Sequence, residues 1–121
     1  MNEKYICFSL DIHTISEANV KEHWRKSHKR HKEQKFLTRM SLLSNRIPQN
    51  LPVKITMCRM SPRKLDSDNL QSAFKYIRDA IAEHFITGKA PGRADDDPRF
   101  EWYYDQQSSK EKYTQLRFDW H

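Results

Sequence analysis

Residues 63–85 read RKLDSDNLQSAFKYIRDAIAEHF and carry the clearest periodicity in the chain. Apolar side chains recur there at spacings of three and four, which is typical of the buried face of an amphipathic helix. They are Leu70, Phe74, Ile77, Ile81 and Phe85. Asp66, Ser67 and Asp68 precede or open this helix, where carboxylates suit both capping and the helix dipole.

The segments around this helix predict a small mixed sheet. Residues 4–12 and 52–60 alternate apolar and polar side chains, the mark of half-buried strands. Residues 100–105 and 113–120 predict two further strands, separated by a polar turn at 106–112. With a helix between the first two strands, the order is β-α-β-α-β-β. We expect one small α/β (α+β) domain with a mixed sheet and two helices.

Residues 17–43 contain no Gly or Pro and predict that first helix. Ser16 or Asn19 is the expected cap. The segment has a weak apolar stripe, formed by Val20, Trp24, Phe36, Met40 and Leu43. The middle of the segment is almost entirely polar, so we expect it to be exposed, or disordered until it meets a ligand.

The net charge of the chain is concentrated in this helix. Residues 21–39 hold two acids and eight cations, a net charge of +6 that equals that of the whole 121-residue chain. The cations are Lys21, Arg25, Lys26, Lys29, Arg30, Lys32, Lys35 and Arg39. A solvated helix that only keeps the protein soluble usually mixes charges of both signs. The segregation favours a surface that binds the phosphates of DNA.

Size and composition exclude several classes of protein. The length fits a single domain, and the lean core of a chain with a mean hydropathy of −0.99 favours a homodimer. We expect no membrane span and no signal peptide. Cys7 and Cys58 are expected to be reduced, half-buried thiols of a cytosolic protein. No spacing typical of a zinc site is present.

Two acidic groups are candidates for a metal site. Asp66 and Asp68 lie two residues apart, and residues 95–97 are three consecutive aspartates before a strand. Mg²⁺ prefers carboxylate oxygens, waters and substrate phosphates. On a continuous helix Lys75 would share the face of Asp68, where it could contact a phosphate. The alternative is that the first pair caps a helix and the triplet is a solvated turn.

Residues 63–97 resemble the RusA family of Holliday-junction resolvases, particularly its phage-encoded relatives. The matching pattern is a basic stretch, a D-x-D-N-L run that opens a helix, and an Asp pair before a strand. In this chain its members are Arg63, Lys64, Asp66, Asp68, Asn69, Leu70, Asp96 and Asp97. The similarity extends from about the first strand to Tyr104.

The resemblance implies a homodimeric, Mg²⁺-dependent endonuclease that resolves four-way DNA junctions by paired nicks. Asp66, Asp68 and Asp97 would bind the metal and act in catalysis, with Asp96 as a neighbouring or fourth metal ligand. The family's active-site lysine corresponds to Ser72 here, so Lys75 is the expected replacement. Arg63 and Lys64 would contact DNA together with the basic helix.

Two alternatives remain open at the level of sequence. One is a DNA-junction-binding relative that has lost catalysis, which the serine at position 72 favours. The other is a protein-interaction module whose basic segment meets an acidic partner. For the nuclease we expect Mg²⁺, or Mn²⁺ in its place, no small-molecule cofactor, and the cytoplasm of a bacterial or phage-infected cell.

Overall fold

The computed structural model describes residues 4–90 and 92–120, which form one four-stranded sheet with helices packed on it. No helix in these ranges is long and apolar enough to cross a membrane. The elements in chain order are β1 (Lys4–Leu10), α1 (Trp24–Ser44), β2 (Val53–Ser61), α2 (Ser67–Ala73), α3 (Lys75–Phe85), a short 3-10 helix η1 (Ala94–Asp96), β3 (Phe100–Ser108) and β4 (Tyr113–Trp120). The predicted β-α-β-α-β-β order and the α+β class are confirmed.

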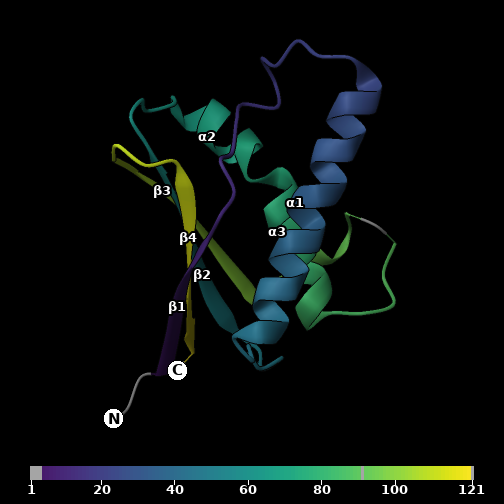
Figure 1. Cartoon of the computed structure of the whole chain (residues 1–121). Helices are drawn as coiled ribbons and strands as arrows, with labels where there is room; N and C mark the ends of the chain where they lie inside the picture. Colours follow the sequence, from purple (N-terminus) through teal and green to yellow (C-terminus); the bar gives the residue numbers. More distant parts are fainter. Residues whose placement is uncertain (1–3, 91, 121) are drawn as a thin grey trace.

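The sheet is mixed, with strand order β1-β4-β2-β3. β4 is antiparallel to both β1 and β2, whereas β2 and β3 run parallel. A parallel pair needs a crossover connection, and α2 and α3 supply it. Figure 1 shows the helices on the same side of the sheet. β1 and β3 are therefore the two edges of the sheet.

The core lies between the sheet and the helices. β2 contributes Val53, Ile55 and Met57, each at most 2% exposed. These alternate residues point to one face because side chains alternate along a strand. The five periodic residues of the α2–α3 segment, from Leu70 to Phe85, are all buried against them, as predicted.

The α2–α3 segment is two helices instead of the single helix predicted. Phe74 lies between them with φ −96° and ψ 3°, outside helical geometry. Its N–H bonds to the carbonyl of Gln71, three residues back, which is the tight closing turn of a helix. The Phe74 ring remains fully buried, 6.0 Å from the ring of Tyr104. The chain thus keeps its apolar stripe across the break, and residues 4–90 and 92–120 contain three α-helices where two helices were expected.

α1 begins seven residues later than predicted and turns a different face to the core. His23 caps it by accepting a hydrogen bond from the Arg25 N–H, in place of Ser16 or Asn19. The buried residues of α1 are Gln34, Thr38 and Leu42. The weak apolar stripe of the sequence is not the face that α1 buries, because Trp24, Phe36, Met40 and Leu43 are exposed. A hydropathy pattern does not reveal this buried face of α1, since Gln34 and Thr38 are polar.

Strand ends and cysteines differ from expectation in smaller ways. β1 ends at Leu10, and β3 continues to Ser108 because its parallel pairing with β2 persists to Ser61. Cys7 is exposed and Cys58 is buried, so only one of the two thiols is shielded. β4 lies between their strands, which rules out a disulfide between them in this fold.

Candidate nucleic-acid interface

Asp66 and Asp68 lie together at the start of α2. Asp66 is the N-cap: its carboxylate accepts from the backbone N–H of Asn69 at 2.9 Å and from the Asn69 side-chain amide at 3.0 Å. Asp68 lies in the first helical turn, and both aspartates are exposed. The capping role is therefore confirmed for Asp66. Each of its oxygens still has a second lone pair that can accept a donor or a cation.

Hydrogen bonds on two sides hold this start of α2 in place. Leu65, just before Asp66, donates its N–H to Gln106 Oε1 at 2.9 Å and accepts from Gln106 Nε2 at 2.7 Å. Asn69 Oδ1 accepts from the Ser16 hydroxyl and, at 2.9 Å, from Asn19 Nδ2. The acidic pair is thus attached both to β3 and to the segment that leads into α1.

The second acidic group is bound into local structure of its own. Asp97 accepts three hydrogen bonds from Arg99, one from its backbone and two from its guanidinium, at 2.9–3.0 Å. These bonds lower the pKa of Asp97 to about 2, so the carboxylate is ionised at neutral pH. Asp95 binds Arg78 at 2.9 Å, and Asp96 is exposed. The triplet is therefore more than a solvated turn.

The structure does not bring the two acidic groups together. The backbone carbonyl of Asp97 accepts a hydrogen bond from the N–H of Phe100 at the start of β3. Leu65 binds Gln106, six residues further along that strand. At about 3.3 Å per residue this is on the order of 20 Å. Because β2 and β3 are parallel, residues after β2 and residues before β3 lie at opposite ends of the pair.

Metal-ligating side chains are correspondingly scattered. Within residues 4–90 and 92–120, no group of three or more His, Cys, Asp and Glu side chains is placed to hold a metal ion. A metal site formed by Asp66, Asp68, Asp96 and Asp97 stays a prediction, because a single chain does not bring these four side chains together. The pair Asp66 and Asp68 alone does fit Mg²⁺, which commonly takes one or two carboxylates with waters and phosphates.

Asp68 and Lys75 lie on two separate helices, since α2 ends at Ala73 and α3 begins at Lys75. The spacing that predicted a shared face assumed one continuous helix. The Lys75 ammonium group is exposed and lies 5.4 Å from the ring centroid of its neighbour Tyr76. At position 72, the serine hydroxyl donates to the Asn69 carbonyl at 3.1 Å. The serine at position 72 therefore bonds to the backbone of its own helix and offers no cation.

Two of the predicted DNA-binding residues of the first helix are neutralised within the chain. Arg30 is half-buried and donates to the carboxylates of Glu17 and Glu22, including a 2.9 Å bond to Glu17. Lys35 binds Glu83 of α3 at 3.0 Å. Both side chains therefore anchor α1, and neither is expected to supply a phosphate contact.

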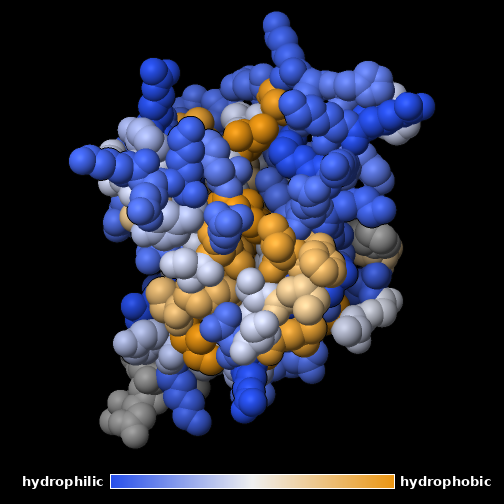
Figure 2. Space-filling view, in the orientation of Figure 1, coloured by the Kyte–Doolittle hydropathy of each residue, from blue (hydrophilic) through white to orange (hydrophobic). Residues whose placement is uncertain are grey.

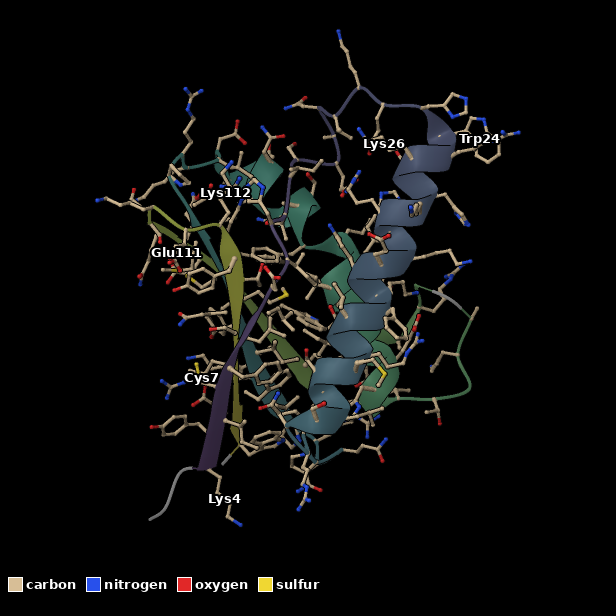
Figure 3. The ribbon with its side chains drawn as sticks, viewed as in Figure 1. Lys4, Cys7, Trp24, Lys26, Glu111 and Lys112 are labelled. Atoms are coloured by element: carbon tan, nitrogen blue, oxygen red, sulfur yellow. The ribbon has the colours of Figure 1, made fainter. Side chains whose placement is uncertain are left out.

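The remaining cations predicted to bind DNA are exposed, and most gather at one end of the molecule. Arg63 and Lys64 follow β2, and Ser109 in the β3–β4 turn binds the carbonyl of Ser61 at 3.0 Å. This places Lys110 and Lys112, which the sequence prediction missed, beside them. Figure 3 shows Lys112 and Lys26 at the same end and Lys4 at the other. We define the basic rim as Lys21, Arg25, Lys26, Lys29, Arg63, Lys64, Lys110 and Lys112, all exposed. Lys32 is exposed further along α1.

A buried arginine underlies the rim. Arg59 is 5% exposed and donates to the backbone carbonyls of Thr14 at 3.0 Å and Arg63 at 2.7 Å. His13 Nε2 lies 3.2 Å from its guanidinium. Burial, Arg59 and Lys112 lower the pKa of His13. No carboxylate of the described residues forms an ion pair with Arg59. Its uncompensated charge adds to the positive potential at this end. An arginine at an inward position of β2 is the sequence signal that could have revealed it.

Comparison with known proteins adds no family assignment. A scan against models of protein families finds no match to this chain, and a search of curated proteins finds none. The resemblance of residues 63–97 to RusA-type resolvases therefore rests on those residues alone.

Proposed function

We propose that this chain is a Mg²⁺-dependent endodeoxyribonuclease that cuts branched DNA. One observation carries the proposal: the exposed Asp66–Asp68 pair lies at the same end of the molecule as the basic rim. A carboxylate pair among cations is where a phosphodiester held by the cations would meet a divalent metal. Figure 2 shows the hydrophilic colouring that dominates this upper end.

The basic rim fits DNA because its cations come from separate parts of the fold. They belong to the approach to α1, to α1 itself, to the β2–α2 loop and to the β3–β4 turn. Contacts from several directions suit a substrate whose arms diverge. Such contacts go to phosphates, so they give affinity and orientation more than sequence choice.

Asp66 and Asp68 would hold the metal, and Mn²⁺ could replace Mg²⁺. When bound, a divalent ion lowers the pKa of a coordinated water and neutralises charge on the phosphate. The remaining tasks fall to the protein. Arg63 and Lys64, close to Asp66 in the chain, would hold the phosphate oxygens, and Gln106 would keep Asp66 fixed through Leu65. No small-molecule cofactor is needed for this chemistry.

Asp97, Asp96 and Lys75 enter this proposal only as the residues that the family resemblance adds. Within one chain, Asp97 is hydrogen-bonded to Arg99 and the ammonium group of Lys75 lies over the ring of Tyr76. A catalytic role for them requires a rearrangement of the loop before β3 or of α3. The reaction is proposed for a homodimer in the cytoplasm of a bacterial or phage-infected cell, with four-way junctions as the substrate.

A second candidate is a DNA-junction-binding protein of the same type that does not cleave. The distance between the two acidic groups favours it, as does the serine at position 72. This candidate keeps the basic rim and its phosphate contacts. It predicts junction binding with no product in either Mg²⁺ or Mn²⁺.

Substitution of one aspartate separates the two candidates. Asp68→Asn should keep the affinity for a four-way junction and lose Mg²⁺-dependent cleavage by at least a hundredfold. Asp11→Asn, an exposed aspartate in the connection from β1 to α1, is the matched control and should cleave normally. Equal cleavage by Asp68→Asn and the wild type would rule out the assigned site. No cleavage by the wild type itself would support the second candidate.

A further inference from the structure

Arg59 is a buried cation whose charge is not balanced by an acid. It follows Met57 by two residues in β2, so its side chain points to the same face of the sheet as the core, and it is 5% exposed. A buried charge is costly unless an opposite charge accompanies it. In the part of the chain that the structure describes, no ion pair includes Arg59. A positive charge is therefore held inside this end of the sheet by uncharged groups.

These uncharged partners leave part of the Arg59 guanidinium without an acceptor. Nε donates to the carbonyl of Thr14 at 3.0 Å, and Nη1 donates to the carbonyl of Arg63 at 2.7 Å. Nη2 faces Nε2 of His13 at 3.2 Å. A guanidinium has five N–H donors, so one N–H on each terminal nitrogen has no acceptor among the described residues. Two such donors suit an oxyanion, which accepts through two oxygens.

His13 occupies the place of an anion beside Arg59. Because the guanidinium can only donate, Nε2 of His13 must accept, which leaves the ring neutral with its proton on Nδ1. Burial, Arg59 and Lys112 lower the pKa of His13 and favour this neutral form. Ser61 is 4% exposed, and its hydroxyl lies 3.4 Å from the same ring nitrogen. One imidazole lone pair thus faces two donors that a charged oxygen would satisfy more strongly.

We infer that Arg59, His13 and Ser61 form a binding site for one phosphate group of the DNA backbone, which we call the Arg59 site. A phosphate oxygen replaces Nε2 of His13 on the guanidinium and accepts from the Ser61 hydroxyl, and a second oxygen accepts from the other free N–H of Arg59. The displaced imidazole then turns a ring N–H toward the phosphate. The choice of DNA as the source of the phosphate rests on the proposed function, whereas the preference for an oxyanion rests on the site itself.

Exposed cations surround the Arg59 site. Arg63, whose carbonyl binds Arg59, and Lys64 are exposed in the loop after β2. Lys112 lowers the pKa of His13, so its charge acts on the imidazole. Figure 3 shows Lys112 at the end of the molecule that carries the basic rim. An anion that approaches from the rim is therefore attracted first by exposed charges and then by the buried one.

His13 is the part of the site that can give way to a ligand. It is half-buried and lies within residues 12–16, which form neither helix nor strand. Rotation of its ring uncovers the guanidinium, while the two backbone carbonyls keep the guanidinium in place. Two acids at this end, Asp11 and Glu111, line a hollow with Lys112. Neither of them binds the guanidinium, so they do not fill the place of the phosphate.

The Arg59 site lies at the strand end that leads to the acidic pair. Arg59 binds the carbonyl of Arg63, and the loop continues through Leu65, which binds Gln106, to Asp66. A phosphate on the Arg59 site is therefore held where this loop begins. Such a contact orients the backbone relative to Asp66 and does not read the sequence of the bases.

Inorganic phosphate tests the site on the wild-type chain without DNA. The ring resonances of the histidines are followed by NMR as phosphate is added. Those of His13 should move and saturate in the millimolar range, and the pKa of His13 should rise, because a phosphate beside the ring stabilises the imidazolium. Sodium chloride at the same ionic strength should move them far less. Equal shifts in phosphate and in chloride would overturn the inference.

A serine variant separates the site from general attraction to the basic rim. Ser61→Ala removes one donor to the phosphate and should weaken its binding about fivefold, the equivalent of one hydrogen bond. Ser108→Ala is the matched control, because Ser108 lies opposite Ser61 in the register of β2 and β3 but is exposed. Arg59 is left unchanged, since its loss is expected to destabilise the fold. Wild-type phosphate affinity in Ser61→Ala would contradict the site.

A short DNA duplex in EDTA establishes whether the phosphate comes from DNA. The duplex should reproduce the rise in the pKa of His13, and Ser61→Ala should bind it more weakly than Ser108→Ala does. A duplex that leaves the His13 resonances unchanged would rule out the DNA backbone as the ligand. No metal is present in this experiment, so the site can hold or fail independently of the proposed cleavage.

Discussion

The side chain of Gln106 binds both backbone groups of Leu65, accepting from its N–H at 2.9 Å and donating to its carbonyl at 2.7 Å. This bidentate contact joins β3 to the loop that precedes α2. It fixes the residue before Asp66, and therefore fixes where the Asp66–Asp68 pair lies relative to the sheet. The position of the proposed catalytic carboxylates depends on an uncharged residue forty residues away in the chain.

Gln106→Leu should weaken this attachment. It leaves the Leu65 N–H and carbonyl without their partner, which we expect to lower the free energy of unfolding by about 1–3 kcal/mol. Amide exchange at Leu65 should accelerate, and junction cleavage should fall with it. Gln107→Leu is the matched control, because that neighbouring side chain is exposed and forms no such bridge. If the amide hydrogen of Leu65 exchanges equally slowly in Gln106→Leu and in Gln107→Leu, the contact with Gln106 has no role in placing Asp66.

Glu17→Gln should destabilise the start of α1. Glu17 binds Arg30 and His31, and the His31 ring is stacked on Tyr76 at 3.7 Å between centroids. Losing the carboxylate should lower the free energy of unfolding by about 2 kcal/mol, a fall in Tm of roughly 8 °C for a domain of this size. Glu33→Gln, an exposed residue of the same helix, should melt like the wild type.

The effect of Glu17 should depend on pH in one direction. Burial raises the pKa of Glu17, but the hydrogen bonds from Arg30 and His31 outweigh it, so the folded pKa lies below the ordinary 4.5. A carboxylate whose pKa is lowered in the folded state stabilises the fold at pH values above its unfolded pKa. This stabilisation is lost as the pH falls through the folded pKa. The difference in Tm between the wild type and Glu17→Gln should therefore be full at pH 7 and shrink below about pH 4.5. A constant difference down to pH 3 would contradict the assignment.

Arg59→Met should unfold the chain more readily than any substitution on the basic rim. It leaves the carbonyls of Thr14 and Arg63 without their donor, at a cost of roughly 2–4 kcal/mol in denaturant titrations. Arg59→Lys should rescue little, because an ammonium group cannot reproduce the fork that reaches both carbonyls. Arg25→Lys, on the exposed surface of α1, should stay within about 0.5 kcal/mol of the wild type. Full stability of Arg59→Lys would show that charge alone, and not the fork, is needed.

Neutralising two cations of the basic rim should weaken DNA binding in a salt-dependent way. Each lost phosphate contact reduces the slope of log affinity against log salt by about 0.9. Lys26→Gln with Lys29→Gln should therefore reduce it by about 1.8. Lys54→Gln is a control at the other end of the sheet, where Lys54 lies opposite Asp119 in the register of β2 and β4 and its ammonium nitrogen is 4.7 Å from the centroid of the Tyr103 ring. Equal slopes for the rim variant and this control would remove the rim from the interface.

The sequence predicts the fold best where its apolar periodicity is strong. The stripe from Leu70 to Phe85 determines which face of α2 and α3 is buried, and the alternation of β2 determines its inward face. α1 is different, because Gln34 and Thr38 fill its buried face and the Thr38 hydroxyl bonds to the Gln34 carbonyl at 2.7 Å. Polar residues on the buried face of a helix leave no hydropathy signal.

The candidate site shows the same limit at a larger scale. The sequence identifies Asp66 and Asp68 at a helix start, and the structure places them there. The sequence cannot show that β2 and β3 are parallel neighbours. This pairing is what separates Asp97 from Asp66 and Asp68. Nor does spacing alone reveal that Arg30 and Lys35 bind acids within the chain. Strand order and pairing of charges are properties of the folded chain.

Cleavage of a labelled four-way junction, compared with a linear duplex of the same sequence, is the most direct test of the central claim. The wild-type chain is incubated with each substrate in Mg²⁺ and in EDTA, at a salt concentration where both are bound. We predict paired nicks in the junction with Mg²⁺, at least tenfold less product from the duplex, and none in EDTA. A junction that is bound but stays intact in both Mg²⁺ and Mn²⁺ would contradict the assignment of this chain as a nuclease.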